Sequence, residues 1–183
     1  MTLQTIGILL TAVTVSIAAI YYTLTLRYAR RNQELQLETR QAQLFMGIYK
    51  TDESLEFCKM QQEMMWDWNW EDFDDFQNKY MFIGGNIEAN AMLSSIFFHY
   101  EGLGVLAKRG LLNTDLVYEL NGWRIISFWE RYIPIVTEWR SITESPKLYE
   151  HLEWLYEEMK GIQTEKGQGY KFREYQDTMS QPS

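Results

Sequence analysis

The chain has 183 residues, of which 46% are hydrophobic and 15% aromatic, so it is too apolar to be an intrinsically disordered protein. Its net charge of −8 argues against nucleic acid as a partner, because phosphate backbones require clustered Lys and Arg side chains. A single cysteine, Cys58, excludes an internal disulfide framework and a metal site built from several cysteines. The length leaves room for one modest domain and one further segment.

The first part of the chain, residues 1–26, is predicted to be a transmembrane helix. Residues 2–26 carry no charged side chain, and a bilayer core of about 30 Å needs roughly 20 helical residues. The expected boundary with water is marked by aromatic and basic residues: Tyr21, Tyr22, Arg27, Tyr28, Arg30 and Arg31. A cleaved signal peptide would have its basic residues before a shorter apolar run. A buried core helix and an uncleaved signal remain as alternatives.

The charge distribution predicts the orientation of this span. Basic residues that flank a first span stay on the cytoplasmic side, so we expect the N-terminus outside and the remaining chain in the cytoplasm. All 25 acidic residues and 14 of the 17 basic residues lie in 32–183, which gives that region a net charge of −11. We expect an anionic leaflet to repel this region, so that it stands off the membrane.

Small residues recur on one face of the predicted span and suggest a second role for it. Ala12, Ser16, Ala19 and Thr23 follow a helical spacing that lets another helix approach closely. These residue types are also common in any such helix. Self-association through this face is therefore one hypothesis, beside binding to another protein.

After the span, residues 27–48 are predicted to form a juxtamembrane helical stalk, because they are rich in good helix formers. A coiled coil is a poorer interpretation, since two of its four core positions would be Gln33 and Arg40. Gly47 suggests a break in the helix, and Thr51 with Asp52 suggests the N-cap of a new helix that runs to about Met65.

The remaining chain is predicted as an acidic helical domain over 49–161 and a polar, mobile tail over 162–183. We expect a short helix capped by Asn69, a long one over 87–109, and one over 115–140 in which Pro134 causes a kink or ends a turn. Ser145 and Pro146 suggest the start of a last helix that stops at Gly161. The prediction is an all-α protein: a transmembrane helix with a stalk, then a cytoplasmic bundle of four to five helices.

The sequence contains no recognisable catalytic, cofactor-binding or metal-binding motif. Two carboxylates, Glu101 and Glu130, nevertheless fall on largely apolar helix faces. One hypothesis makes them an acid–base pair in a cleft. The alternative, which we favour, is a structural ion pair of Glu101 with Arg124 or Arg131, because a buried carboxylate is costly without a partner.

An aromatic and acidic segment, residues 66–76, allows two interpretations. Exposed aromatic rings among charges resemble the energetic centre of a protein interface, which makes Trp66, Trp68, Trp70 and Phe73 a candidate partner surface. The other interpretation places these rings in the core of a small domain.

The order of several segments resembles a known family. Its most specific part is the run FHYEGLGVLAKRGLL at 98–112, followed by DLVY at 115–118. The chain resembles a family of membrane-anchored helical proteins of bacteria and archaea that carries a domain of unknown function. The resemblance implies a prokaryotic plasma-membrane protein and transfers no activity.

Together these patterns predict a single-pass plasma (inner) membrane protein whose cytoplasmic domain is a protein-interaction or accessory-subunit module, and not an enzyme. Its expected partners are membrane lipid and another protein or a second copy of itself; no cofactor is expected. The alternative is a membrane-tethered small-ligand sensor or enzyme that uses a cleft around Glu101 and Glu130.

Overall fold

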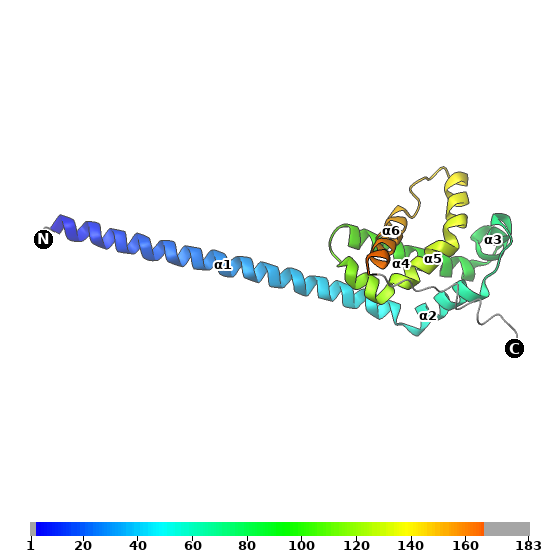
Figure 1. Cartoon of the computed structure of the whole chain (residues 1–183), viewed down its shortest axis with the longest axis horizontal. Coiled ribbons are helices and arrows are strands. Elements are labelled where there is room, and N and C mark those ends of the chain that lie inside the picture. The colour runs from blue at the N-terminus through cyan, green and yellow to red at the C-terminus, as the bar shows by residue number, and fades with distance from the viewer. Residues whose placement is uncertain (1–2, 167–183) are drawn as a thin grey trace. The chain divides into compact units, whose positions relative to one another are not determined.

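The computed structural model describes residues 3–166, and over this range it consists of helices and turns without a strand (Figure 1). The predicted all-α class is therefore confirmed for the described residues. The chain divides into two compact units, residues 1–44 and residues 45–183. The division falls at 44/45, four residues before the predicted end of the stalk.

The first helix, α1 (Leu3–Asp52), is 50 residues long and carries the apolar segment at its beginning. It continues through Gly47, so the predicted break at this residue is wrong. A single glycine costs a helix only about 1 kcal/mol, which the turns on either side tolerate. Thr51 and Asp52 also lie inside α1, and the next helix is capped by Ser54 instead.

The second helix, α2 (Leu55–Gln62), begins where the Ser54 hydroxyl accepts a hydrogen bond from the backbone N–H of Phe57 at 3.2 Å. It passes directly into a single π-helical turn, η1 (Glu63–Asp67). Here the N–H of Trp68 bonds the carbonyl of Glu63, five residues back. This wider turn is rare in proteins and often lies near functional sites.

A short acidic helix, α3 (Phe73–Tyr80), follows as expected, although Asp72 and not Asn69 caps it. The Asp72 carboxylate accepts from the N–H of Asp75 at 2.8 Å. A 3₁₀ turn, η2 (Phe82–Gly84), then leads to Gly85, whose φ of 80° lies in the left-handed region that glycine tolerates best.

Two long helices form the centre of the second unit, close to the predicted ranges 87–109 and 115–140. Asn86 caps α4 (Ile87–Lys108) and Asn113 caps α5 (Thr114–Ile142). The helix α5 continues through Pro134 without ending. Figure 1 shows its last part, in yellow, turning away from the first part.

The last helix, α6 (Glu150–Glu165), differs from its prediction at both ends. Residues 143–149 form turns, so Ser145 and Pro146 do not start the helix, and α6 continues past Gly161. Tyr149, with a φ of 58°, precedes its first turn and supplies no side-chain cap. Residues 162–165 of the predicted tail therefore belong to α6, and residues 167–183 lie outside the described residues.

The core of the second unit lies where α6 packs against both α4 and α5. It is dominated by large aromatic rings, which bury more apolar area than any other side chains. The largest fully buried side chains include Phe76, Phe97, Tyr100, Phe128, Trp129 and Tyr132.

Candidate functional site

The apolar segment of α1 is long and apolar enough to span a membrane. Its most apolar 18-residue window has a mean hydropathy of 1.9, and none of that window is buried, so by length and composition it can cross a membrane. The hydroxyls of Thr11, Thr14, Ser16, Thr23 and Thr25 each bond the carbonyl four residues back. Such internal bonds satisfy hydroxyls that hydrocarbon could not. The segment therefore combines an apolar surface with satisfied polar groups.

The predicted partner surface lies in the aromatic and acidic segment 66–76, which we call the tryptophan segment. This segment is largely a part of the core. Trp68 is only 4% exposed, and its ring stacks on Tyr80 with 4.1 Å between ring centroids. Trp70 and Phe73 are partly buried against the same core. Only Trp66, which is 50% exposed, remains at the surface. The interface interpretation is thus wrong for Trp68, because η1 turns it into the core, whereas Trp70 and Phe73 are only partly buried.

Arg131 of α5 holds the π-helical turn in place. The wide turn leaves the carbonyl of Met64 without the N–H of Trp68, which bonds Glu63 instead. The Arg131 Nε donates to the Met64 carbonyl at 3.3 Å, and the neighbouring Tyr132 hydroxyl donates to it at 2.8 Å. The guanidinium also donates to the carbonyl of Trp68 and lies 4.5 Å from the centroid of the Trp70 ring. Arg131 therefore stabilises irregular backbone and is not the partner of Glu101.

Glu101 has a structural role that the sequence did not predict. One carboxylate oxygen accepts the N–H of Leu152 at 2.8 Å; the other accepts the N–H of His151 at 3.3 Å and lies 2.8 Å from the His151 ring Nδ1. These N–H groups belong to the first turn of α6, which lacks a cap from its own segment. Glu101 of α4 thus caps α6, where the helix dipole also favours a negative charge. The predicted ion pair with Arg124 or Arg131 is wrong.

Gly104, three residues after Glu101 on α4, allows α4 and α6 to approach closely enough for the Glu101 cap. A Cβ atom on Gly104 would lie 2.3 Å from the backbone oxygen of His151, so the two helices meet here at a distance that only glycine permits. A Cβ on Gly102, two residues earlier, would have nothing within 4 Å, so the close approach depends on Gly104 alone.

Glu130 lies elsewhere and does not join Glu101. It is exposed, and its carboxylate lies 3.2 Å from Nζ of Lys160, in the second half of α6. His151 and Lys160 are nine residues apart on this helix, about 13 Å along its axis. The two carboxylates are therefore too far apart for an acid–base pair, and the predicted cleft around them is wrong.

A buried polar cluster joins the end of α1 to α4 and α5. The Asp52 side chain, in a residue only 3% exposed, accepts a hydrogen bond from the Asn121 side-chain amide. Nε2 of His99 lies 2.7 Å from its other oxygen, although the two atoms are not aligned for a hydrogen bond. The Asp52 carbonyl also accepts from the Cys58 thiol at 3.2 Å and from Arg124 at 3.5 Å.

This cluster accounts for residues whose roles the sequence left open or assigned differently. Asp52 had the local pattern of a helix cap, and its position at the end of α1 gives it a different function. The polar side chains of His99 and Asn121 come from helices far away in the sequence, so no local spacing indicates their meeting. Arg124 bonds the backbone of Asp52, which places it away from its predicted partner Glu101.

A surface groove lies beside the cluster, between α2 with η1 on one side and α5 on the other. Its volume is about 460 Å³, counted with the space open to solvent. It is lined by polar and aromatic side chains: Cys58, Gln61, Gln62, Met65, Trp66, Trp123, Arg124 and Ser127. We call it the α2–α5 groove. Its aromatic walls and its single arginine are features of sites that bind a small or extended ligand.

The floor of the groove is connected to the core. The Gln61 amide donates to the hydroxyl of Tyr100, which is fully buried, and this burial raises the pKa of Tyr100 well above its usual range. Arg124 links the groove to the buried cluster through the Asp52 carbonyl. Within residues 3–166, no group of three or more His, Cys, Asp or Glu side chains is placed to hold a metal ion.

Comparison with known proteins identifies the family. The chain matches a family described as a domain of unknown function (DUF4760) over residues 5–159. No curated protein and no solved structure is significantly similar to it. The match includes the apolar segment of α1, the tryptophan segment and the α2–α5 groove, so it extends well beyond the run at 98–118. The family indicates no enzyme class, and the chain belongs to the DUF4760 family.

Proposed function

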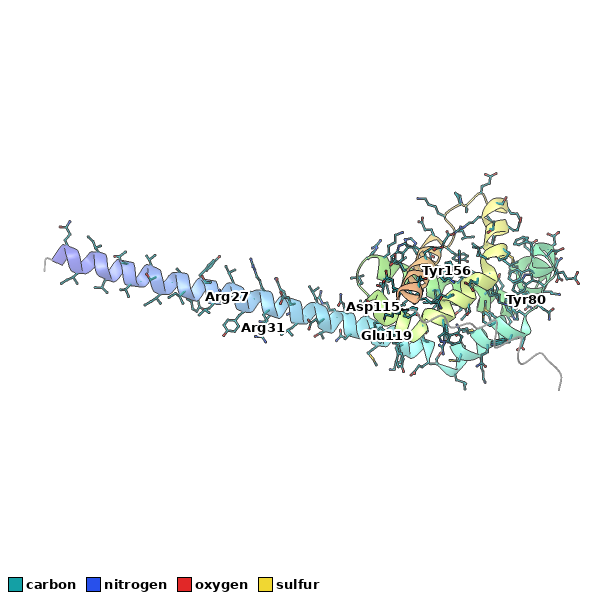
Figure 2. The ribbon with its side chains drawn as sticks, viewed as in Figure 1. Arg27, Arg31, Tyr80, Asp115, Glu119 and Tyr156 are labelled. Carbon is teal, nitrogen blue, oxygen red and sulfur yellow. The ribbon has the colours of Figure 1, made fainter. Side chains whose placement is uncertain are left out.

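We propose that this chain is a single-pass protein of the prokaryotic plasma (inner) membrane, with its N-terminus outside and a cytoplasmic helical domain that binds another protein. The observation that carries the anchor is the unburied apolar segment of α1, followed at once by Arg27, Arg30 and Arg31. Figure 2 shows Arg27 and Arg31 along this helix. Because basic residues beside a first span stay in the cytoplasm, they favour this orientation.

The charge of the remaining chain supports a domain that works away from the lipid surface. Residues 32–183 carry a net charge of −11, which an anionic leaflet repels. The basic residues next to the span are attracted to the same leaflet. The protein thus combines a positively charged boundary with an acidic domain, which suits recruitment of a cytoplasmic partner to the membrane.

An exposed apolar tip supports the binding of a protein partner. Phe82, Ile83 and Ile87, at the turn between α3 and α4, are 67%, 73% and 68% exposed. Single exposed hydrophobic residues are common, but three large ones within six positions make a candidate binding surface. We call this surface the apolar tip. It replaces the tryptophan segment as the candidate partner surface.

A second candidate function, the sensing of a small ligand, rests on the α2–α5 groove and not on Glu101 and Glu130. The groove contains a positive charge, Arg124, beside two aromatic walls. This combination suits a small anionic ligand with an apolar body. Isothermal titration of the protein with short aromatic carboxylates tests this second function. Arg124→Gln should abolish the heat of binding, whereas the control Glu130→Gln should leave it unchanged.

The orientation is tested by labelling single cysteines in a Cys58→Ser background. Thr2→Cys should react with a membrane-impermeant maleimide in intact cells. Ser180→Cys should react only after the cells are permeabilised. The opposite pattern, or extraction of the protein from membranes by alkaline carbonate, would contradict the proposed anchor and its orientation.

The partner surface is tested by gentle purification of the tagged full-length protein from its native membranes. A stoichiometric partner should be lost from the double variant Phe82→Ser, Ile83→Ser. It should be retained by Leu55→Ser, a matched change at another exposed hydrophobic residue. If the partner is recovered equally with the double variant and with Leu55→Ser, the apolar tip is excluded as the binding surface.

A further inference from the structure

We propose that two copies of this chain pair through the outward face of α4, as antiparallel helices related by a two-fold axis at the centre of that face. The face, which we call the α4 stripe, consists of Ile87, Ala91, Ser94, Ser95, Phe98 and Gly102. The inference goes beyond the proposed function, whose partner is a different protein and whose test changes Phe82 and Ile83, outside the stripe. It shares with that function only the proposed anchor.

The α4 stripe lies on the side of the helix that faces away from the core. At 3.6 residues per turn its members fall within a sector of about 100°, and Leu93 and Tyr100, on the opposite side, are fully buried. Ile87 is 68% exposed and Phe98 is 66% exposed. A Cβ atom on Gly102 would have no described atom within 4 Å. The stripe therefore presents two large apolar side chains beside open space on the same face.

The order of large and small residues makes the stripe complementary to itself. In an antiparallel pair, a two-fold axis at its centre places each residue level with the one equally far beyond the axis in the second copy. Ile87 then lies level with Gly102 of the second copy, and Phe98 lies level with Ala91 of the second copy. Each large side chain meets a small one, as the packing of helix ridges into grooves requires. A parallel pair would instead oppose Phe98 to Phe98.

The charge distribution favours this face as the contact between two copies. Residues 32–183 carry a net charge of −11, so two copies repel each other over most of their surface, whereas the stripe residues carry no charge. Two acidic side chains lie beside the stripe: Glu88 at one edge, and Glu101, which is turned to the start of α6. The stripe is thus a part of the domain that a second acidic copy can approach without placing charges in the contact.

The size of the stripe indicates where the pair forms. From Ile87 to Gly102 the helix rises about 22 Å, and a helix is about 10 Å wide. A contact of these dimensions is well below the roughly 800 Å² per partner of a standard stable interface. Two copies that are anchored in one membrane meet at a much higher effective concentration, which compensates for a small contact. The area therefore favours a second anchored copy over a freely diffusing partner.

Single cysteines in a Cys58→Ser background test the pairing in intact cells, with copper phenanthroline as the oxidant and the full-length chain. Ser95→Cys lies beside the two-fold axis and should form covalent dimers about tenfold faster than Ser141→Cys, at an exposed serine of α5. Ile87→Cys alone should form none, because its two copies would lie about 22 Å apart along the helices. Co-expression of Ile87→Cys with Gly102→Cys should restore the dimer.

Three results would overturn the proposal: equal dimer formation at 95 and 141, dimers of Ile87→Cys alone, and a covalent product with a different protein. The gel counts the protein wherever it lies in the cell. A failure of the anchor is recorded separately, as extraction by alkaline carbonate, and is therefore distinguishable from a failure of the pairing.

A second measurement uses two glycines that the fold itself leaves open. In the Ser95→Cys protein, Gly102→Trp fills the space opposite Ile87 of the second copy and should lower the rate of dimer formation about tenfold. Gly161→Trp is the matched control, because Gly161 is an exposed helical glycine whose Cβ would also have no described atom within 4 Å. Circular dichroism should be the same for both variants. Equal rates of dimer formation in the two proteins would show that the α4 stripe is not the contact.

Discussion

Removal of the Glu101 carboxylate should selectively loosen α6. The substitution Glu101→Ala removes two hydrogen bonds from backbone N–H groups of α6 and the contact with the His151 ring, at 2.8 to 3.3 Å. A hydrogen bond to a charged group contributes about 1.5–3 kcal/mol, and loss of a helix cap costs about 1 kcal/mol. Because the three contacts share one carboxylate and are not additive, we expect a loss of about 2–4 kcal/mol in the free energy of unfolding.

The assay is urea unfolding of the full-length protein in detergent micelles, followed by tryptophan fluorescence. With a denaturant dependence of about 1–3 kcal/mol per M, Glu101→Ala should lower the urea midpoint by roughly 1–2 M. Glu101→Gln keeps one good acceptor and should lower it by about half as much.

Glu130→Ala is the matched control for this prediction. It removes a carboxylate whose partner, Lys160, is itself substantially exposed, and such pairs contribute about 0–1 kcal/mol. If Glu101→Ala and Glu130→Ala shift the midpoint equally, the capping role of Glu101 is refuted.

Three further predictions use the same unfolding assay. Gly104→Ala should destabilise the protein by about 1–3 kcal/mol, because the new Cβ meets the backbone of α6, whereas Gly102→Ala should be neutral or stabilise it by up to about 1 kcal/mol. Arg131→Met should cost about 2–4 kcal/mol, since the Trp68 carbonyl loses this donor and the Met64 carbonyl keeps only the Tyr132 hydroxyl; an effect below 1 kcal/mol would contradict that role. Trp68→Ala should cost about 3–5 kcal/mol and Trp66→Ala less than half of that, and the reverse order would contradict their different burial.

The sequence predicted those helices whose ends are fixed by their own neighbouring residues. Asn86 and Asn113 each cap the helix that directly follows them, so local patterns were sufficient to locate α4 and α5. The start of α6 could not be found in this way, because its cap is Glu101, some 50 residues earlier in the chain. A local Ser-Pro pattern was available nearby and gave the wrong start.

The candidate site was predicted less well, for a similar physical reason. The alternation of tryptophans with polar residues does not reveal that a π-helical turn rotates Trp68 into the core. Asp52, His99 and Asn121 come from three helices, and only the folded chain brings them together. The groove likewise depends on the packing of α2 and η1 beside α5, which no pattern within either segment encodes.

The π-helical turn also has a consequence for how related sequences should be aligned. A π-helical turn accommodates one more residue than an α-helical turn, so deletion of any residue in 63–67 would let the segment close with ordinary bonds. The side chains before and after the deletion would keep their relative orientation, because the wider turn had absorbed the extra residue. The Met64 carbonyl would also have a backbone donor of its own. We therefore expect that related sequences with a one-residue gap at this place also lack the arginine at position 131.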